Sequence, residues 1–430
     1  MDLTVEGNIY TNNAFQHCCI GIENGIITSI KKQLKGNQYL RFPNALILPA
    51  GIDLHVHFRD PGGTHKEDFS SGTQAAAYGG ITCIFDMPNT RPPTTTRRSL
   101  LKKEQTGIAK SYIDFGLYAM ITDSNIGTLS ELSPHCAGFK LYMGETTDTS
   151  GLDAKHLSAI FKATMETTKR TAIHAEDRSC LQRSKADENS LKDHLSTRPA
   201  SCEEQAIQQV LDAHTHHSSP LHICHLSSCE GFELLRKKPS SISIGVTPHH
   251  LLFDVDMISQ NQTYFKVNPP LRTHFDREML WYGLQHGLID VIESDHAPHT
   301  LEEKSMAFDE APSGIPGVET MYPLFLSQAN KKILSYNRVV QLLCERPAEL
   351  MNIPKGKIAV GYDADFIVIS PKASKKIASD DLHSKCGWTP YESMNALFPS
   401  HVFLRGEPLI EEGELVAKQG TGSLITPQVQ

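Results

Sequence analysis

Short apolar runs recur along the middle of the chain, and segments with helical periodicity separate most of them. The runs predict β-strands near residues 46–56, 81–86, 114–119, 137–142, 171–174, 221–225, 242–246 and 289–294. The clearest helix is predicted at 199–216, where Pro199 begins the segment and Ser201 and Glu204 have the spacing of a capping box. Eight strands that alternate with helices predict a parallel (β/α)8 barrel. An open doubly wound sheet is the alternative, but no GxGxxG motif follows any of the strands.

The two ends of the chain have a different, β-like pattern. The stretch "IGIENGIITSI" (20–30) places two apolar runs around Asn24-Gly25, which is a strong hairpin signal. Near the other end, "GYDADFIVI" (361–369) and "HVFLRGEPLI" (401–410) predict short strands. Neither end has enough strands to be stable alone. We therefore expect residues 1–48 and 357–430 to form one small composite β-sandwich beside a barrel at 49–356.

Composition excludes several classes of function. The chain has 430 residues and a formal charge of −8, and it contains no basic tract, so we expect no nucleic-acid partner. No apolar run has the length of a membrane span, and the first residues lack a secretory signal, so we expect no membrane association. The ten cysteines include no CxxC pair, which predicts free thiols in a reducing compartment and a cytoplasmic location.

Two histidines end the first predicted strand of the barrel, in "GIDLHVHFRD" (51–60). His55 and His57 are two residues apart and therefore point to the same side of a strand. In a (β/α)8 barrel, active sites lie at the carboxyl ends of the strands. An isolated HxH pair would equally well be one core residue and one exposed residue, so the pair alone does not establish a metal site.

Three further strands end in residues of the same kind. His174 ends the fifth strand, His225 the sixth and Asp295 the eighth. His222 is three residues from His225, so only one of the two can point inward, and we expect His222 to be structural. Imidazole and carboxylate groups at matching strand ends predict a site for Zn²⁺ or a similar divalent ion.

Lys140 lies in the middle of the apolar strand "CAGFKLYMGE" (136–145). A buried ammonium beside divalent ions would be desolvated and repelled. One interpretation is that the strand is exposed on one side and Lys140 extends its amine to solvent. The other is chemical: a neutral lysine amine can add CO2 to form a carbamate, an anionic two-oxygen ligand able to bridge two metal ions.

Eight motifs in a fixed order resemble the dihydroorotase family of the amidohydrolase superfamily. They are "DLHVHFRDPG" (53–62), "DMPNT" (86–90), "GFKLYMGET" (138–146), "HAED" (174–177), "HICHLS" (222–227), "VTPHHL" (246–251), "VNPPLR" (267–272) and "SDHAPHT" (294–300). The resemblance covers nearly the whole chain, and it is to the type with a carboxylated lysine as bridging ligand. It implies the reversible cyclisation of N-carbamoyl-L-aspartate to L-dihydroorotate, a step of pyrimidine synthesis.

The resemblance also implies a binuclear zinc centre. One ion would be held by His55, His57 and Asp295 and the other by His174 and His225, with carboxylated Lys140 and a hydroxide bridging both. Asp295 would be the general base and then the general acid of the reaction. A third zinc is found in some relatives, and here Cys224 with His249 or His250 could hold it; the alternative for this histidine pair is a supporting or conformational role.

For substrate, the resemblance implies that Arg59 binds the carboxylate, because a planar guanidinium binds a carboxylate bidentately. Asn89 and His299 would also bind this carboxylate, and Asn268 would contact the ring amide. Outside this context, Arg59 could form a surface ion pair, and both asparagines could be turn residues. A threonine-bearing loop folds over substrate in relatives, which makes Thr146 in "GETTDTSG" (144–151) a candidate.

Two other functions remain open. An allantoinase or hydantoinase would share the metal ligands, but a ring without a carboxylate would give Arg59 and Asn89 nothing to bind. An inactive scaffold partner of aspartate transcarbamoylase would have lost ligands, whereas every predicted ligand is present here. We expect a homodimer that could associate with aspartate transcarbamoylase.

Overall fold

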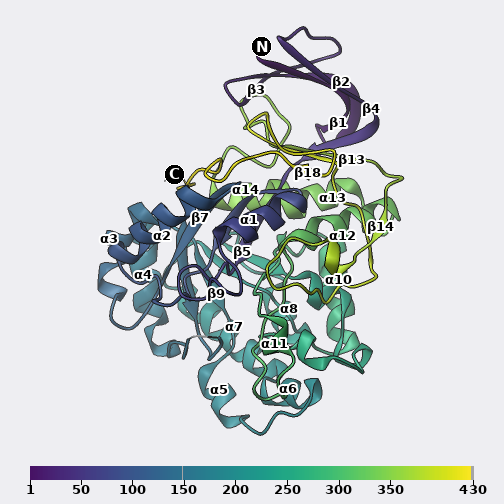
Figure 1. Ribbon diagram of the computed structural model, residues 1–430. Helices are drawn as coiled ribbons and strands as arrows, with labels where there is room; N and C mark the ends of the chain where they lie inside the picture. The colour runs from purple at the N-terminus through teal and green to yellow at the C-terminus, as the bar shows by residue number, and fades with distance from the viewer. Residues whose placement is uncertain (148, 428–430) are drawn as a thin grey trace.

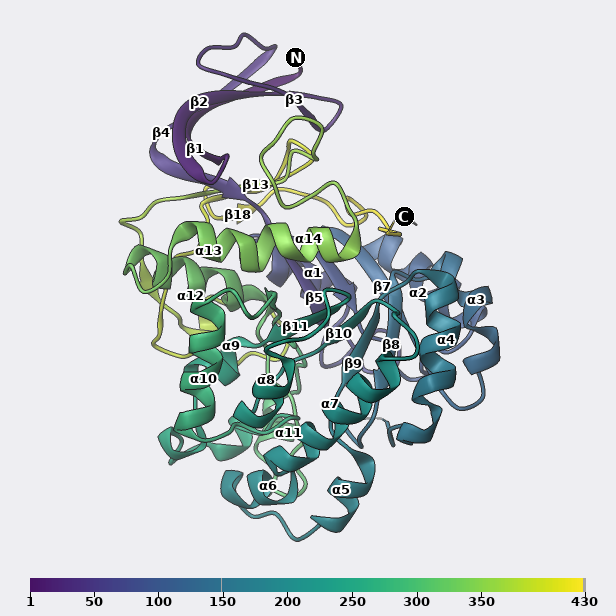
Figure 2. The same ribbon diagram turned by 180° about the vertical axis from the view of Figure 1, so that it is seen from behind.

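The computed structural model describes residues 1–147 and 149–427. Two sheets organise the chain, and Figure 1 shows them one above the other. The lower sheet is built from the middle of the chain and is surrounded by helices. The upper sheet brings strands from both ends of the chain together. Figure 2 shows the same arrangement from behind, with the last described residues near β7 (Asp114–Met120) of the lower sheet.

The lower sheet is a barrel of eight parallel strands, as the apolar runs predict. Neighbouring strands along the chain pair in order from β5 to β12. The barrel closes through a parallel bridge between Val56 and His296, next to which the His57 N–H donates to the His296 carbonyl over 2.7 Å. The strands are β5 (Gly51–Val56), β6 (Ile81–Asp86), β7 (Asp114–Met120), β8 (Gly138–Tyr142), β9 (Thr171–His174), β10 (Leu221–Ile223), β11 (Ile242–Val246) and β12 (Val291–Ile292).

Helices follow the strands and cover the outside of the barrel (Figures 1 and 2). All eight strands are buried along their whole length, which explains why they read as apolar runs without alternation. The helices are α1 (Phe69–Tyr78), α2 (Arg97–Lys110), α3 (Leu129–Leu132), α4 (Leu157–Thr167), α5 (Arg178–Arg183), α6 (Leu191–Thr197), α7 (Ala200–His214), α8 (Cys229–Leu235), α9 (Pro248–Leu252), α10 (His274–Gln285), α11 (Leu301–Lys304), α12 (Val318–Asn330), α13 (Tyr336–Val340) and α14 (Arg346–Met351).

The upper sheet joins the two termini, as predicted. Its order is β18-β17-β16-β13-β4-β1-β2-β3, so C-terminal β13 pairs with N-terminal β4. The hairpin at Asn24-Gly25 is confirmed, because Glu23 pairs with Ile26. The strands are β1 (Leu3–Thr11), β2 (Ala14–Glu23), β3 (Ile26–Lys31), β4 (Gln38–Pro49), β13 (Phe366–Ile369), β16 (His401–Leu404), β17 (Glu407–Glu411) and β18 (Glu414–Leu415), and a separate pair is formed by β14 (Lys375–Lys376) and β15 (Asn395–Ala396).

The sheet of the termini has an apolar core of its own. Buried side chains from both ends, including Val5, Ile20, Phe366 and Phe403, pack together in one cluster. The last residues then leave this sheet, and the Ile425 N–H donates to the carbonyl of Phe115 on β7 over 2.7 Å. The domain boundaries at 48/49 and 356/357 stay a prediction.

Three local predictions are wrong. The run at 46–56 is not one strand, because it comprises the end of β4 and all of β5 on either side of Ala50. Ser201 and Glu204 form no capping box, because the helix begins two residues earlier than that motif requires, with Pro199 at its N-cap. The cysteines are not all free thiols, since Cys180 and Cys202 form a disulfide between α5 and α7.

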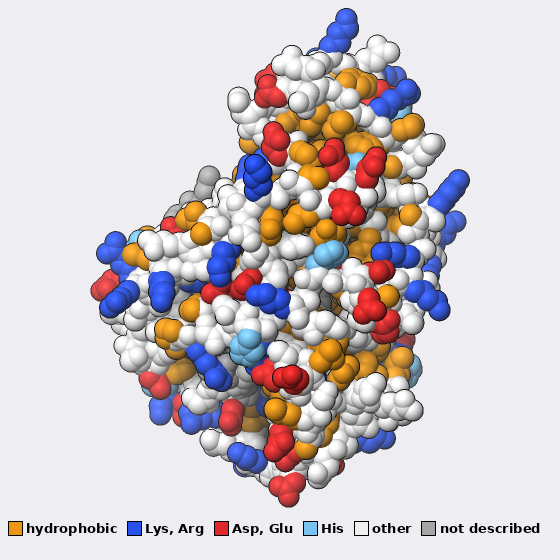
Figure 3. Space-filling model, in the orientation of Figure 1, with side chains coloured by type: hydrophobic (Ala, Val, Ile, Leu, Met, Phe, Trp, Pro, Cys, Tyr) orange, Lys and Arg blue, Asp and Glu red, His pale blue; other side chains and the backbone are white. Residues whose placement is uncertain are grey.

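The surface carries charges of both signs. On the face shown in Figure 3, Lys and Arg side chains lie among Asp and Glu side chains. Within the described residues, no helix is both long enough and apolar enough to span a bilayer.

Candidate metal centre

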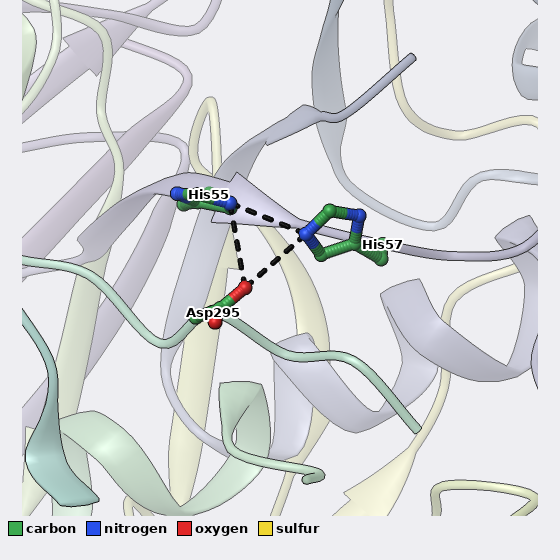
Figure 4. A group of neighbouring side chains, drawn as sticks. All are labelled: His55, His57 and Asp295. Carbon is green, nitrogen blue, oxygen red and sulfur yellow. Dashed lines mark hydrogen bonds and ion pairs between the residues drawn. The ribbon is translucent and has the colours of Figure 1, made fainter. Parts of the chain in front are cut away.

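His55, His57 and Asp295 meet at the mouth of the barrel (Figure 4). His55 Nε2 lies 3.2 Å from His57 Nε2, and Asp295 Oδ1 lies 3.3 Å from the first and 3.2 Å from the second. The first and last strands are joined beneath them, because Asp53 Oδ1 accepts from the backbone N–H groups of His55 and Ser294, each over 3.1 Å. The predicted juxtaposition of strand ends is therefore present, and the three groups can ligate one ion.

The hydrogen bonds of His57 show why a cation fits there. Its Nδ1 lies 2.7 Å from Asn89 Oδ1, an acceptor, so Nδ1 carries the proton of the neutral ring. The lone pair of Nε2 then points at the Asp295 carboxylate and at His55. Burial lowers the pKa of His57, which keeps the ring neutral. Three buried acceptor atoms converge on one point, an arrangement that a divalent cation would satisfy.

The charge of the cluster is set by burial and by its neighbours. Burial, with Lys140 second, lowers the pKa of His55 to about 4. Burial opposes ionisation of Asp295, but His55 and His57 outweigh it and hold the pKa of this carboxyl below its ordinary value. The site therefore presents neutral imidazoles and an ionised carboxylate, the protonation states that metal ligands require.

His174 and His225 form a second group beside the first. His174 Nδ1 lies 3.2 Å from His225 Nε2. His174 Nε2 lies 2.8 Å from Glu176 Oε2, so this nitrogen carries the proton and Nδ1 offers a lone pair. Arg198 in turn holds Glu176 through both carboxylate oxygens. A carboxylate behind a histidine in this way fixes the tautomer and the orientation of a metal ligand.

His222 is structural, as predicted. Its ring nitrogens lie 2.9 Å from Ser243 Oγ and 3.1 Å from Glu293 Oε2. Glu293 also accepts from the backbone N–H of His225 over 2.7 Å. This carboxylate needs the glycine at position 245, since a Cβ there would lie 2.4 Å from Glu293 Oε1.

Lys140 is fully buried in β8, so it does not extend its amine to solvent, and that interpretation is wrong. Its Nζ lies 3.2 Å from Cys224 Sγ and 5.0 Å from the centre of the Tyr142 ring. Among the described residues, no carboxylate forms a salt bridge with it. A buried ammonium without a counter-charge is costly, which makes this amine chemically unusual.

The residues proposed for a third ion differ in their surroundings. Both ring nitrogens of His250 are engaged, with Thr247 Oγ1 at 2.8 Å and the Pro269 carbonyl at 3.1 Å. His249 is buried, and neither of its ring nitrogens has a hydrogen-bond partner among the described residues. Cys224 is buried beside Lys140. Of the two histidines, only His249 therefore has nitrogens available for a further ligand.

A small cavity opens over the two histidine groups and contains most of the predicted substrate residues. Arg59 Nη2, at one side of it, lies 3.2 Å from Nε2 of His299, which is not among the lining residues. The cavity is lined by His55, His57, Arg59, Asn89, Tyr142, Thr146, Thr147, His174, His225, Asn268, Asp295, Ala297, Ser313 and Gly314.

The loop after β8 lies against this cavity. Asn268 Nδ2 donates to Thr146 Oγ1 over 3.3 Å, and Asn89 Nδ2 donates to the Thr147 carbonyl over 3.2 Å. Arg198 donates to the carbonyl of Glu145 over 2.8 Å. The two asparagines predicted to hold substrate thus also hold the loop, and residue 148 of this loop lies outside the described residues.

Sequence reasoning missed the carboxylates that support the histidines. Glu293 interrupts the apolar run "DVIESD" two residues before Asp295, which is the same kind of signal that singled out Lys140. Glu176 follows His174 by two residues in "HAED". Their role needs partners, His222 and Arg198, that lie far away in sequence.

Comparison with known proteins identifies the family of the chain. The model of the amidohydrolase family matches residues 46–407. A protein named dihydroorotase from Methanosarcina acetivorans is 38% identical over 437 residues, covering 97% of this chain and 93% of that protein. Another from Thermoplasma acidophilum is 39% identical over 420 residues, covering 96% of each. The chain belongs to the amidohydrolase family, among the dihydroorotases. The family resemblance seen in the motifs is thereby confirmed.

Solved structures show the same fold. An L-hydantoinase (dihydropyrimidinase) from Arthrobacter aurescens superimposes on this amidohydrolase with a TM-score of 0.94 at 27% identity, covering 99% of both chains. A D-hydantoinase from a Bacillus sp. has a TM-score of 0.91 at 25% identity and covers 100% of both. Hydantoinases, which the sequence left as an alternative, therefore have the same fold as this chain. The relatives at higher identity are named dihydroorotase.

Proposed function

We propose that this amidohydrolase is a dihydroorotase, which interconverts N-carbamoyl-L-aspartate and L-dihydroorotate. The observation that carries the proposal is the position of Arg59 in the wall of the cavity that opens over His57 and Asp295. A guanidinium there can bind the carboxylate that distinguishes dihydroorotate from a hydantoin or dihydrouracil ring. The similarity to proteins named dihydroorotase over nearly the whole chain supports the same assignment.

Two zinc ions per chain fit the donor set. His55, His57 and Asp295 would hold one ion, and His174 and His225 the other. The support is the chemistry of the buried atoms: neutral ring nitrogens and an ionised carboxylate face one another with their lone pairs. When bound, the ions would polarise the amide carbonyl and supply a water acidic enough to attack near neutral pH. A third ion, if present, would use His249 and Cys224.

Carboxylation of Lys140 would complete this centre. Lys140 is buried in β8, two positions before Tyr142, whose neighbour on β9 is His174. Addition of CO2 to the neutral amine forms an N–C bond and releases one proton, and the side chain becomes an anion. An ammonium at this position would first lose one proton to give that neutral amine. The resulting carbamate would supply negative charge and could bridge two cations.

Side chains of the protein would bind the substrate and transfer the protons. Arg59, Asn89 and His299 would hold the substrate carboxylate, and Asn268 would hold the ring amide. In ring opening, Asp295 would take the proton of the attacking water and deliver it to the leaving ring nitrogen. In cyclisation it would take the proton from the ureido nitrogen. Thr146 would close the site over substrate from the loop at 144–151.

We further propose a cytoplasmic homodimer that could associate with aspartate transcarbamoylase. The support for this arrangement is the family resemblance. The free thiols also favour a reducing compartment, although they are eight rather than ten.

The test is turnover by protein loaded with zinc in bicarbonate buffer. We expect L-dihydroorotate to be hydrolysed and N-carbamoyl-L-aspartate to be cyclised, with two zinc ions per chain by elemental analysis. Turnover of allantoin or hydantoin in place of dihydroorotate would move the chain to the hydantoinase class. Zinc binding with no turnover of any of these rings would favour the scaffold function.

A further inference from the structure

His299 is buried between two cationic side chains. Its Nε2 lies 3.2 Å from Arg59 Nη2, and its Nδ1 lies 3.1 Å from Lys66 Nζ. The carbonyl oxygen of Ser313 is the third contact, 3.1 Å from Nε2. A neutral imidazole has one N–H donor and one acceptor nitrogen, so these contacts decide which nitrogen carries the proton.

Of the two neutral tautomers, the form protonated on Nε2 satisfies the contacts with Ser313 and Lys66, whereas the form protonated on Nδ1 satisfies only the contact with Arg59. A carbonyl oxygen can only accept, so Nε2 must carry the proton that faces Ser313. An ammonium can only donate, so Nδ1 must be the lone pair that faces Lys66. Arg59 Nη2 and the Nε2–H of His299 are then two donors side by side. An anionic oxygen near both would accept from Arg59 and would share the Nε2–H of His299 with the Ser313 carbonyl.

Glu303 acts against this tautomer. Its Oε2 lies 3.5 Å from His299 Nδ1 and would attract a proton to that nitrogen. Lys66 neutralises this effect, because its Nζ lies 2.7 Å from Glu303 Oε1 while it also donates to the ring. Glu303 is itself fixed by its place at the start of α11, where it accepts from the Thr300 N–H over 3.1 Å.

The charges around the ring keep it neutral. Burial is the largest effect on His299, and the cations of Arg59, Lys66 and Lys304 act in the same direction, so the pKa falls to about 3 despite Glu303. Lys304 is buried on the same side of the site, where it donates to the carbonyls of Pro312 and Gly314 over 2.9 and 3.0 Å.

We propose that Lys66 is a positioning residue that fixes His299 as the Nε2–H tautomer, so that His299 and Arg59 form a two-donor seat for the substrate carboxylate. This inference rests on the proposed dihydroorotase function. Lys66 does not touch the substrate in this account. It acts through His299, from the side of the ring that faces away from Arg59.

Removal of Lys66 has a specific chemical consequence. In Lys66→Met, Glu303 would become the partner of Nδ1 and draw the proton there. The neutral ring would then present a lone pair to the carboxylate. At lower pH the ring would take up a second proton and regain Nε2–H, because Glu303 stabilises the imidazolium while one opposing cation is gone. The defect in substrate binding should therefore depend on pH.

The test is the pH dependence of KM for L-dihydroorotate in the zinc-loaded enzyme. In Lys66→Met we expect KM to rise about tenfold at pH 8 and to return toward the wild-type value at pH 6, with kcat reduced less than threefold. Lys66→Arg keeps a cationic donor and should restore most of the wild-type KM. An unchanged KM, or a rise that is equal at both pH values, would overturn the proposal.

A second measurement separates this inference from the proposed function. In ¹⁵N-histidine-labelled protein, the signals of His299 are assigned as those missing from His299→Gln. Wild-type protein should show a neutral ring with the proton on Nε2, and Lys66→Met should show a proton on Nδ1. A wild-type ring protonated on Nδ1, or on both nitrogens, would overturn the tautomer assignment. If the wild-type enzyme does not turn over dihydroorotate, the proposed function is wrong. The NMR measurement tests the tautomer of His299 independently of that result.

Discussion

Nε2 of His57 lies 3.2 Å from Oδ1 of Asp295, although 238 residues separate them in the sequence. The hydrogen bond from the ring's other nitrogen to Asn89 leaves a lone pair on Nε2, so two acceptors face each other in a buried site. The contact also places Asp295 where a metal ligand and a proton carrier are needed at once.

Replacing Asp295 should separate these two roles from substrate binding. In Asp295→Asn we expect kcat to fall about 10³-fold, because the amide cannot carry the proton from water to the ring nitrogen. Binding of dihydroorotate, measured by calorimetry, should persist because Arg59 is intact. Asp380→Asn changes an exposed carboxylate and is the matched control. Retention of wild-type kcat in Asp295→Asn would exclude Asp295 as the proton carrier.

Lys140 gives a chemical test of the bridging carbamate. Lys140→Met keeps an unbranched side chain of similar length and cannot add CO2, so the variant should bind at least one zinc ion fewer per chain. Wild-type protein reconstituted with ¹³C-bicarbonate should give a carbamate signal by NMR that Lys140→Met lacks. Equal zinc content in the two proteins, with no carbamate signal in either, would rule out the bridge.

The disulfide between Cys180 and Cys202 makes a quantitative prediction. Without reductant, denatured protein should titrate eight thiols, and after reduction it should titrate ten. Because the bridge closes a segment with a sequence separation of 22, Cys202→Ser should lower the free energy of unfolding by about 3 kcal/mol under oxidising conditions. Ten titratable thiols before reduction would show that the bridge does not form.

Buried neutral histidines predict how stability depends on pH in the absence of metal. Burial lowers the pKa values of His55 and His250 to about 4 in the folded protein, from the ordinary value of 6.5. Between these values the unfolded chain binds more protons than the folded chain, so stability is lost as the pH falls from 6.5. We expect each of these histidines to lower the free energy of unfolding by about 1.5 kcal/mol as the pH falls from 6.5 to about 5.

Urea unfolding of the zinc-free protein at these two pH values measures this effect. The window lies above the ordinary pKa values of carboxyl groups, which limits their contribution. His250→Gln should show a smaller difference between the two pH values than wild type. A free energy of unfolding that is the same at both would contradict the assignment of neutral rings.

Much of this molecule follows from local sequence signals. The barrel is predictable because each of its strands is buried on both faces and therefore reads as a continuous apolar run. The ligand residues are predictable because they end those runs, as His174 ends β9. The end of β4 and the whole of β5 form one continuous apolar run, so the boundary between these two strands cannot be predicted from the run.

What the sequence could not provide depends on contacts between distant segments. The pairing of Cys180 with Cys202 requires α5 and α7 to lie together. The support of His174 by Glu176 and Arg198, and the contact of Lys66 with His299, require loops of the barrel mouth to meet. Burial of Lys140 was also undecidable from a strand pattern that fits either exposure.

The measurement that tests the central claim most directly compares two rings in two proteins. The ratio of kcat/KM for L-dihydroorotate to that for dihydrouracil is measured in the wild type and in Arg59→Met. We predict a ratio well above one in the wild type and a fall of about 10²-fold in the variant, caused by loss of dihydroorotate binding rather than by gain of dihydrouracil turnover. A wild-type ratio below one, or a ratio that Arg59→Met leaves unchanged, would contradict the assignment of this site to a carboxylate-bearing ring.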